Sequence, residues 1–96
     1  MTQYNGWTNY ETWRINLEML DGMTPEDFGV DVRRLDLDEV LEQVTRLSES
    51  MAAYVYEMVE QDAKGFALDL ALSFLHEVDW YGIAEHMLSD AKTELV

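Results

Sequence analysis

The sequence predicts a small all-α protein, a single-domain bundle of four main helices with one additional short helical turn. Apolar residues recur at intervals of three and four along most of the chain. No stretch alternates polar and apolar residues as a half-buried strand does. The 96 residues, 48% of them hydrophobic, suit one modest core, so residues 1–96 are expected to form a single acidic domain.

The first helix is expected at about residues 9–21. Thr8 and Glu11 have the spacing of a capping box, in which each side chain accepts a hydrogen bond from the other residue's backbone amide. Apolar residues at helical spacing follow and are expected to face the core: Tyr10, Trp13, Leu17 and Leu20. The Asp21-Gly22 pair ends this helix.

A short helical turn is expected at about residues 25–28. Thr24 serves as its cap and Pro25 occupies the first helical position, where a missing amide hydrogen costs nothing. Phe28 and Gly29 end the turn. The following segment GVDVRR is expected to be an extended linker with its two valines, Val30 and Val32, packed.

The main helix is expected at about residues 37–63, with Asp36-x-x-Glu39 at its start and Lys64-Gly65 at its end. Its apolar stripe is the longest in the chain and comprises Leu37, Val40, Val44, Leu47, Met51, Tyr54 and Met58. Leu41, Val55 and Val59 widen this stripe to a core-facing band. Ser48-Glu49-Ser50 is the weak point of this helix, the place where a break or bend would occur.

Two further helices complete the bundle, at about residues 66–78 and 80–94. The first of them is apolar on nearly all sides, which is typical of a helix buried at the centre of a domain. Asp79 is expected to cap the last helix. The inward positions of that helix are Trp80, Ile83, Ala84, Met87, Leu88 and Ala91.

The net charge of the chain limits the classes of molecule that the protein can bind. Twenty acidic residues stand against six basic ones, a net charge of −14. Such a protein repels nucleic acid and anionic membranes and attracts basic surfaces, so direct nucleic-acid binding is not expected. The segment FALDLALSFL is too short to span a bilayer, and no secretory signal is visible. Without cysteine the chain suits a reducing compartment, and we expect a cytoplasmic protein.

The sequence indicates a protein that is not an enzyme and that holds no cofactor or metal. Nucleophile motifs, phosphate-binding loops and dinucleotide fingerprints are absent. His76 and His86 do not form the zinc-protease pattern, which needs a second histidine four residues after the first, where Trp80 stands. The two histidines are expected to be ordinary surface or half-buried residues.

The candidate partner-binding site is an acidic face of the main helix. Its members lie away from the apolar stripe: Asp38, Glu42, Glu49, Glu57 and Glu60. Carboxylates in rows on a rigid rod imitate the charge of a nucleic-acid backbone. The alternatives are a solvated face that keeps the protein soluble and adaptation to high salt, since only two lysines are present.

The aromatic opening MTQYNGWTNYETW supplies a second candidate surface. Tyr10 and Trp13 belong to the expected helix and are assigned to the core. Tyr4 and Trp7 precede the helix and either contact a partner or fold back over the domain as a lid.

The segments NGWTNYETW and VDWYGIAEHML resemble the hallmarks of a family of small phage and plasmid proteins. Gly82 in the second segment stands where a larger residue is expected. The family's genes often accompany anti-restriction genes, so the resemblance implies an origin in a mobile element. By analogy, the character is similar to that of anti-CRISPR and anti-restriction inhibitors, many of which occupy the basic nucleic-acid channel of a defence complex.

The leading functional expectation is therefore a phage- or plasmid-encoded inhibitor that acts stoichiometrically in the host cytoplasm. Its acidic helices would dock on a basic surface of a defence complex or nuclease by DNA mimicry. The alternative is a structural or regulatory adaptor, monomeric or homodimeric, whose acidity serves solubility or salt adaptation alone. A small enzyme is a third class.

Overall fold

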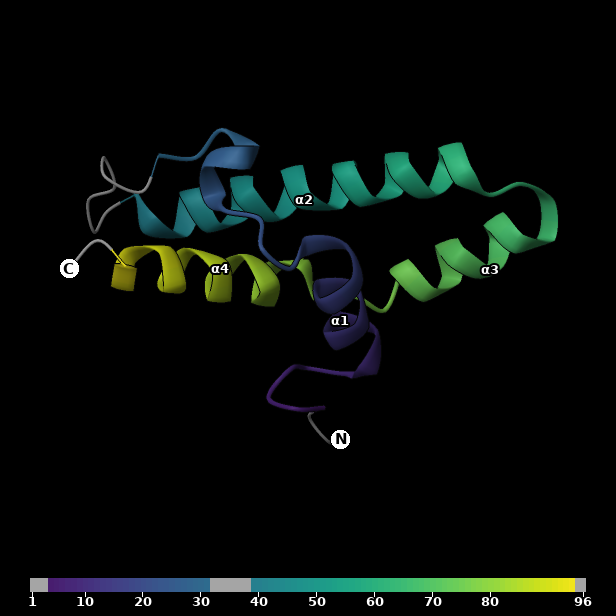
Figure 1. Ribbon diagram of the computed structural model, residues 1–96, viewed down its shortest axis with the longest axis horizontal. Helices are drawn as coiled ribbons and strands as arrows, with labels where there is room; N and C mark the ends of the chain where they lie inside the picture. Colours follow the sequence, from purple (N-terminus) through teal and green to yellow (C-terminus); the bar gives the residue numbers. More distant parts are fainter. Residues whose placement is uncertain (1–3, 32–38, 95–96) are drawn as a thin grey trace.

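The computed structural model describes residues 4–31 and 39–94. Every named secondary-structure element in this part of the chain is a helix or a helical turn (Figure 1). The elements in chain order are α1 (Tyr10–Ile15), the π-helical turn η1 (Asn16–Leu20), the 3-10 turn η2 (Pro25–Phe28), α2 (Val40–Asp62), α3 (Gly65–Leu75) and α4 (Trp80–Glu94). The predicted fold class, four main helices with one short turn, is confirmed.

The bundle is built around the pairing of α2 with α4. The two helices run antiparallel, with α4 beside the N-terminal half of α2, while α3 accompanies the C-terminal end of α2 and forms a hairpin with it (Figure 1). The core lies mainly between α2 and α4 and is completed by residues of α1, η1, the end of α3 and the loops. Its buried hydrophobic members are Ile15, Leu20, Val30, Val44, Leu47, Met51, Val55, Leu75, Val78, Ile83, Ala84 and Leu88.

Helix α2 follows its predicted stripe over the middle of its length. Leu47 and Met51 are fully buried, whereas Leu41 near the start is 70% exposed. Tyr54 lies at the edge of the core, with its ring 5.9 Å from that of Phe28. The helix runs unbroken through this weak point at Ser48-Glu49-Ser50. The predicted start, Leu37, lies outside the described residues.

The Ser48 side chain explains why the helix does not break. Ser48 is buried, and its hydroxyl donates to the backbone carbonyl of Thr45 at 2.7 Å. This bond satisfies the polar group inside the helix without opening the backbone ladder. Serine therefore substitutes for an apolar residue on the core side of α2.

The short turn η2 forms as the sequence predicts. Thr24 and Asp27 make a reciprocal capping box, and Pro25 follows at the start of the turn. Gly29 ends it with φ of 81°, a left-handed conformation that favours glycine. Val30 is buried, as expected, and Val32 lies outside the described residues.

The predicted inward face of the first helix is correct at Leu20, which is buried, and wrong at Tyr10 and Leu17. The helix buries Thr12 and Ile15, and η1 then buries Leu20, whereas Tyr10 and Leu17 are 38% and 48% exposed. The sequence of this helix is compatible with two buried stripes. The stripe that is buried in the structure contains Thr12. The reason is a polar contact of Thr12 with the start of α4, described below.

The predicted cap of α1 is also wrong. The residue before the helix is Asn9, whose side-chain oxygen accepts from the Thr12 amide at 2.9 Å. Asn9 has the extended backbone, φ of −156°, that a capping residue needs. The Thr8 hydroxyl is occupied elsewhere, since it donates to the Asp79 carboxylate at 2.6 Å.

The central burial expected for α3 is wrong as well. Leu75 is its only buried residue, while Phe66 is 74% and Leu70 56% exposed. The physical reason lies in the lengths of the helices. Helix α2 extends beyond α4, and α3 packs on this overhang, so only one side of α3 is covered (Figure 1). Its last helical residue is Leu75, three residues before the predicted end.

The buried stripe of α2 predicts a severe effect for Leu47→Asp. A carboxylate placed at this fully buried position has no partner, and its cost of several kcal/mol is comparable to the whole stability of a small domain. We expect circular dichroism to show an unfolded chain. Leu41→Asp is the matched control, since Leu41 is 70% exposed, and it should melt within a few degrees of the parent. A folded Leu47→Asp variant would contradict the core assignment.

Candidate functional site

The acidic side chains proposed from the sequence lie in a row on α2. At 3.6 residues per turn, Glu42, Glu49 and Glu60 fall within about 20° of one line along the helix, and Glu57 lies about 60° away. All four are exposed. The buried side chains of α2 occupy the opposite side, so the row faces away from α4. Asp38, the fifth predicted member, lies outside the described residues.

The row contains one basic residue. Arg46 donates to the Glu42 carboxylate at 3.0 Å, and both side chains are more than half exposed. Pairs of this exposed kind contribute about 0.3–0.5 kcal/mol. Glu42 can therefore exchange Arg46 for an external cation at little cost. Further along, Gln61 donates to Glu57 at 3.5 Å.

The aromatic opening folds back on the domain. Tyr4 and Trp7 exchange two backbone hydrogen bonds of 2.7 and 2.8 Å around Asn5-Gly6. Both central residues have positive φ, which is the mark of a type I′ turn and the reason for the Asn-Gly pair. Glycine at position 6 is what permits a tight turn here, and the Asn-Gly dipeptide is a strong hairpin signal.

The rings of this turn contact two different helices. The Tyr4 ring lies 5.2 Å from that of Tyr10 and 5.0 Å from that of Trp13. The Trp7 ring lies 4.7 Å from the His86 imidazole on α4. Tyr4 remains 40% exposed, and Trp7 is half-buried. Both side chains thus lie against the domain, as expected of a lid, and both keep part of their surface exposed, so contact with a partner stays a prediction.

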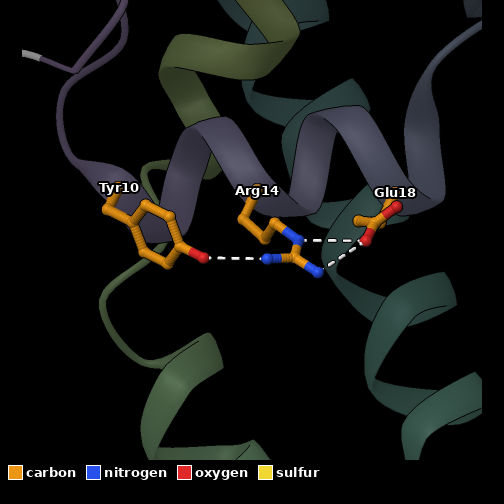
Figure 2. A network of polar contacts seen from close by, with 3 residues as sticks. All are labelled: Tyr10, Arg14 and Glu18. Carbon is orange, nitrogen blue, oxygen red and sulfur yellow. Dashed lines mark hydrogen bonds and ion pairs between the residues drawn. The ribbon is translucent and has the colours of Figure 1, made fainter.

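The outer side of α1 and η1 carries a small polar network (Figure 2). The Arg14 guanidinium donates to Glu18 at 3.0 Å through Nε and to the Tyr10 hydroxyl at 2.8 Å. The hydrogen bonds to Glu18 and then to Tyr10 raise the pKa of Arg14 above its usual value. Arg14 is thus a permanent cation already shared between two neighbours, which limits its availability to a partner.

A second polar network joins the start of α1 to the start of α4. The Thr12 hydroxyl donates to the Asn9 side-chain oxygen at 2.6 Å and accepts from the Asp79 amide at 2.9 Å. The Asn9 amide group donates to the Glu77 carbonyl at 2.7 Å, and Thr8 binds the Asp79 carboxylate. Residues almost 70 positions apart are thereby fixed to one another. We call this network of Thr8, Asn9, Thr12, Glu77 and Asp79 the α1–α4 junction.

Asp79 also caps α4, as the sequence predicts. Its second carboxylate oxygen accepts from the Gly82 amide at 3.0 Å. A β-carbon at position 82 would lie 2.5 Å from the Asp79 carboxylate oxygen that Thr8 binds. Glycine at this position therefore leaves room for the carboxylate to serve both partners. The larger residue expected there from the resemblance would crowd the junction.

A surface cavity of about 260 Å³ lies between the end of η1, the start of η2 and α4. Asp21, His86 and Asp90 contribute polar groups to its wall, and His86 Nδ1 lies 3.5 Å from the Asp90 carboxylate. Its volume is just below the range of about 300–1,000 Å³ that is typical of ligand pockets. Within residues 4–31 and 39–94, no three His, Cys, Asp or Glu side chains are placed to hold a metal ion.

The described helices include none that is long and apolar enough to cross a membrane. Residues 1–94 match a family of unknown function, DUF7249. The chain belongs to this family. Neither the curated proteins nor the solved structures include a match to the chain. Membership therefore covers nearly the whole domain, including both halves of the α1–α4 junction and the acidic row on α2.

The α1–α4 junction predicts that Thr12→Val destabilises the fold although it preserves shape. The change leaves the partly buried Asp79 amide without an acceptor, at a cost of about 1–3 kcal/mol. A loss of this size lowers Tm by at least about 4 °C in a domain of this length. Thr45→Val is the control, because the exposed Thr45 hydroxyl bonds only within α2. Equal melting of the two variants would show that the junction adds no stability.

Proposed function

We propose that this protein is a stoichiometric inhibitor, encoded by a phage or plasmid, that docks the acidic row of α2 on a basic nucleic-acid-binding surface of a host defence complex. The observation that carries the proposal is the position of the row. Glu42, Glu49, Glu57 and Glu60 are exposed on the side of α2 opposite its buried stripe. A partner reaches them without disturbing the core.

The rigidity of α2 supports this role. The helix has 23 residues in one unbroken element, and its carboxylates are held at fixed intervals. From Glu42 to Glu60 the row extends about 27 Å. A partner with lysine and arginine side chains at matching intervals gains several contacts without ordering a flexible segment, which lowers the entropy cost of binding.

The charge density indicates how the contact works. A duplex of about 27 Å carries roughly 16 phosphate charges, four times the number of carboxylates in the row. The mimicry proposed here is therefore one of separate lysine or arginine contacts, with the remaining acids of the chain contributing long-range attraction. Such attraction speeds association and weakens as salt rises.

The choice of a defence complex rests on the resemblance of NGWTNYETW and VDWYGIAEHML to proteins of mobile elements. In our proposal these two segments build the scaffold, because they supply Thr8, Asn9, Thr12 and Asp79 to the α1–α4 junction. The acidic row lies outside both segments. Partner choice is thus assigned to α2.

A structural or regulatory adaptor is the second candidate. The observation that favours it is the exposed apolar surface of α3, where Phe66 is 74% and Leu70 56% exposed. Contiguous apolar surface of this kind marks interaction sites. An adaptor would use α3 for its contact, and its acidity would serve solubility.

Retrieval of partners from a host lysate, with and without duplex DNA as competitor, tests the inhibitor proposal. An inhibitor of the proposed kind should retain a basic, nucleic-acid-binding protein and lose it as DNA is added. The purified pair should then show loss of the partner's DNA binding at one-to-one stoichiometry. A partner retained equally in excess DNA would exclude the mimicry mechanism.

Reversing two charges of the row should weaken the complex. Glu42→Lys with Glu49→Lys turns two attractive contacts into repulsive ones, and we expect affinity to fall at least about tenfold. Glutamine at both positions should give an intermediate loss. Folding should change little, because exposed charges contribute about 0–1 kcal/mol.

The matched control is Glu26→Lys with Glu85→Lys, which changes the net charge equally at exposed positions outside α2 and outside the α1–α4 junction. Titration calorimetry of all variants at two salt concentrations separates the outcomes. Equal losses in the two double variants would mean that net charge alone matters and that α2 is only a solvated face.

A further inference from the structure

Helix α3 has an uncovered apolar side. Phe66, Leu70 and Ser73 lie within about 60° of one another around the helix axis. Phe66 is 74% and Leu70 56% exposed, and both Ala67 and Ser73 are exposed as well. The opposite side, which includes the buried Leu75, packs toward α2. An exposed phenylalanine and leucine one turn apart, with alanine and serine beside them, form an apolar surface whose exposure to water is unfavourable.

The charges around this side restrict its occupant. Within Gly65–Leu75 the only charged side chain is that of Asp69, in a chain with a net charge of −14. A basic partner that binds through carboxylates has only the Asp69 carboxylate to bind on α3. A second copy of this chain, by contrast, is repelled least along α3, because each copy brings one carboxylate there.

The arrangement of α3 also suits a two-fold axis. Leu70 is the middle residue of Gly65–Leu75, and Phe66 and Phe74 lie four residues to either side of it. Phe74 is partly buried against the core, with its ring 6.2 Å from that of Tyr10, so only its outer part is available to a partner. In an antiparallel pair centred on Leu70, the Phe66 of each copy approaches this outer part of the other copy's Phe74. The exposed Ser73 then lies opposite Ala67, and these small residues let the two helices approach closely.

We propose that the exposed side of α3 is the interface of a homodimer, with the two α3 helices antiparallel and centred on Leu70. This inference is independent of the proposed function, which uses α2. One 11-residue helix per copy buries a few hundred Å², well below the about 800 Å² per partner of a standard interface. The dimer is therefore weak and concentration-dependent.

The test measures the oligomeric state by sedimentation equilibrium at low and high salt. The dimer should strengthen as salt rises, because salt screens repulsion between two acidic copies and leaves apolar contact intact. Binding of a basic partner through α2 has the opposite salt dependence. A parent protein that stays monomeric at high concentration and high salt would overturn the proposal.

Single substitutions locate the interface. Phe66→Asp and Leu70→Asp should each weaken dimerisation at least about tenfold. Because Phe66 is mostly exposed, Phe66→Asp should keep the helical circular dichroism of the parent. Leu41→Asp is the matched control, since Leu41 is a leucine on α2 that is more than half exposed, as Leu70 is, and it should dimerise normally. Dimerisation of Phe66→Asp at the parent's affinity would place the interface elsewhere.

A cross-link tests the two-fold axis directly. The chain has no cysteine, so Leu70→Cys introduces a single thiol, and under mild oxidation the two copies should form a disulfide dimer. Leu41→Cys is the control and should remain reduced under the same conditions. Equal cross-linking of both variants, or none at position 70, contradicts the antiparallel arrangement. Glu42→Lys with Glu49→Lys should not alter the cross-link, which separates this proposal from that for α2.

Discussion

The Asp79 backbone amide and carboxylate hold the start of α1 against the start of α4. The amide donates to the buried Thr12 hydroxyl, and the carboxylate binds Thr8 and caps α4 at Gly82. Because α1 has only six residues, it is too short to be stable by its own hydrogen bonds. The α1–α4 junction therefore sets the position of α1 on the bundle. The junction also fixes the rotation of α1 about its axis, since the buried Thr12 hydroxyl must keep its hydrogen-bond partners.

This constraint gives a physical reason for the two segments that resemble mobile-element proteins. NGWTNYETW supplies the Asn5-Gly6 turn, the Asn9 cap and the inward Thr12. The segment VDWYGIAEHML supplies Asp79, with glycine where the carboxylate folds over the helix start. The two segments are distant in sequence and adjacent in space, so each is only half of one structural unit.

Sequence periodicity predicted the elements whose partners are local. The stripe of α2 around Leu47 and the cap at Thr24 were predicted correctly, because helix caps and amphipathic stripes depend on residues within a few turns of one another. The face of α1 was wrong because a bond from Thr12 to Asp79, 67 residues away, chose between two stripes. The burial of α3 was wrong for a related reason. The apolar side chains of Phe66 and Leu70 predict burial of the helix. The sequence of α3 does not show that the rest of the chain leaves this side uncovered. The acidic row was predictable as a set of outward residues on one helix.

The two proposed surfaces divide the charge of the protein between them. The row on α2 concentrates carboxylates, whereas α3 carries Asp69 alone. At physiological salt the screening length is about 8 Å, so repulsion between copies is strongest where acidic surfaces come close. In the proposed scheme a basic partner bound along α2 removes part of this repulsion, and pairing through α3 then becomes more favourable. Partner binding at α2 and pairing at α3 are linked reciprocally. If partner binding strengthens pairing, pairing strengthens partner binding by the same factor. In this proposed scheme, the separation of acidic from apolar side chains on neighbouring helices would let one small domain respond to a single partner at two surfaces.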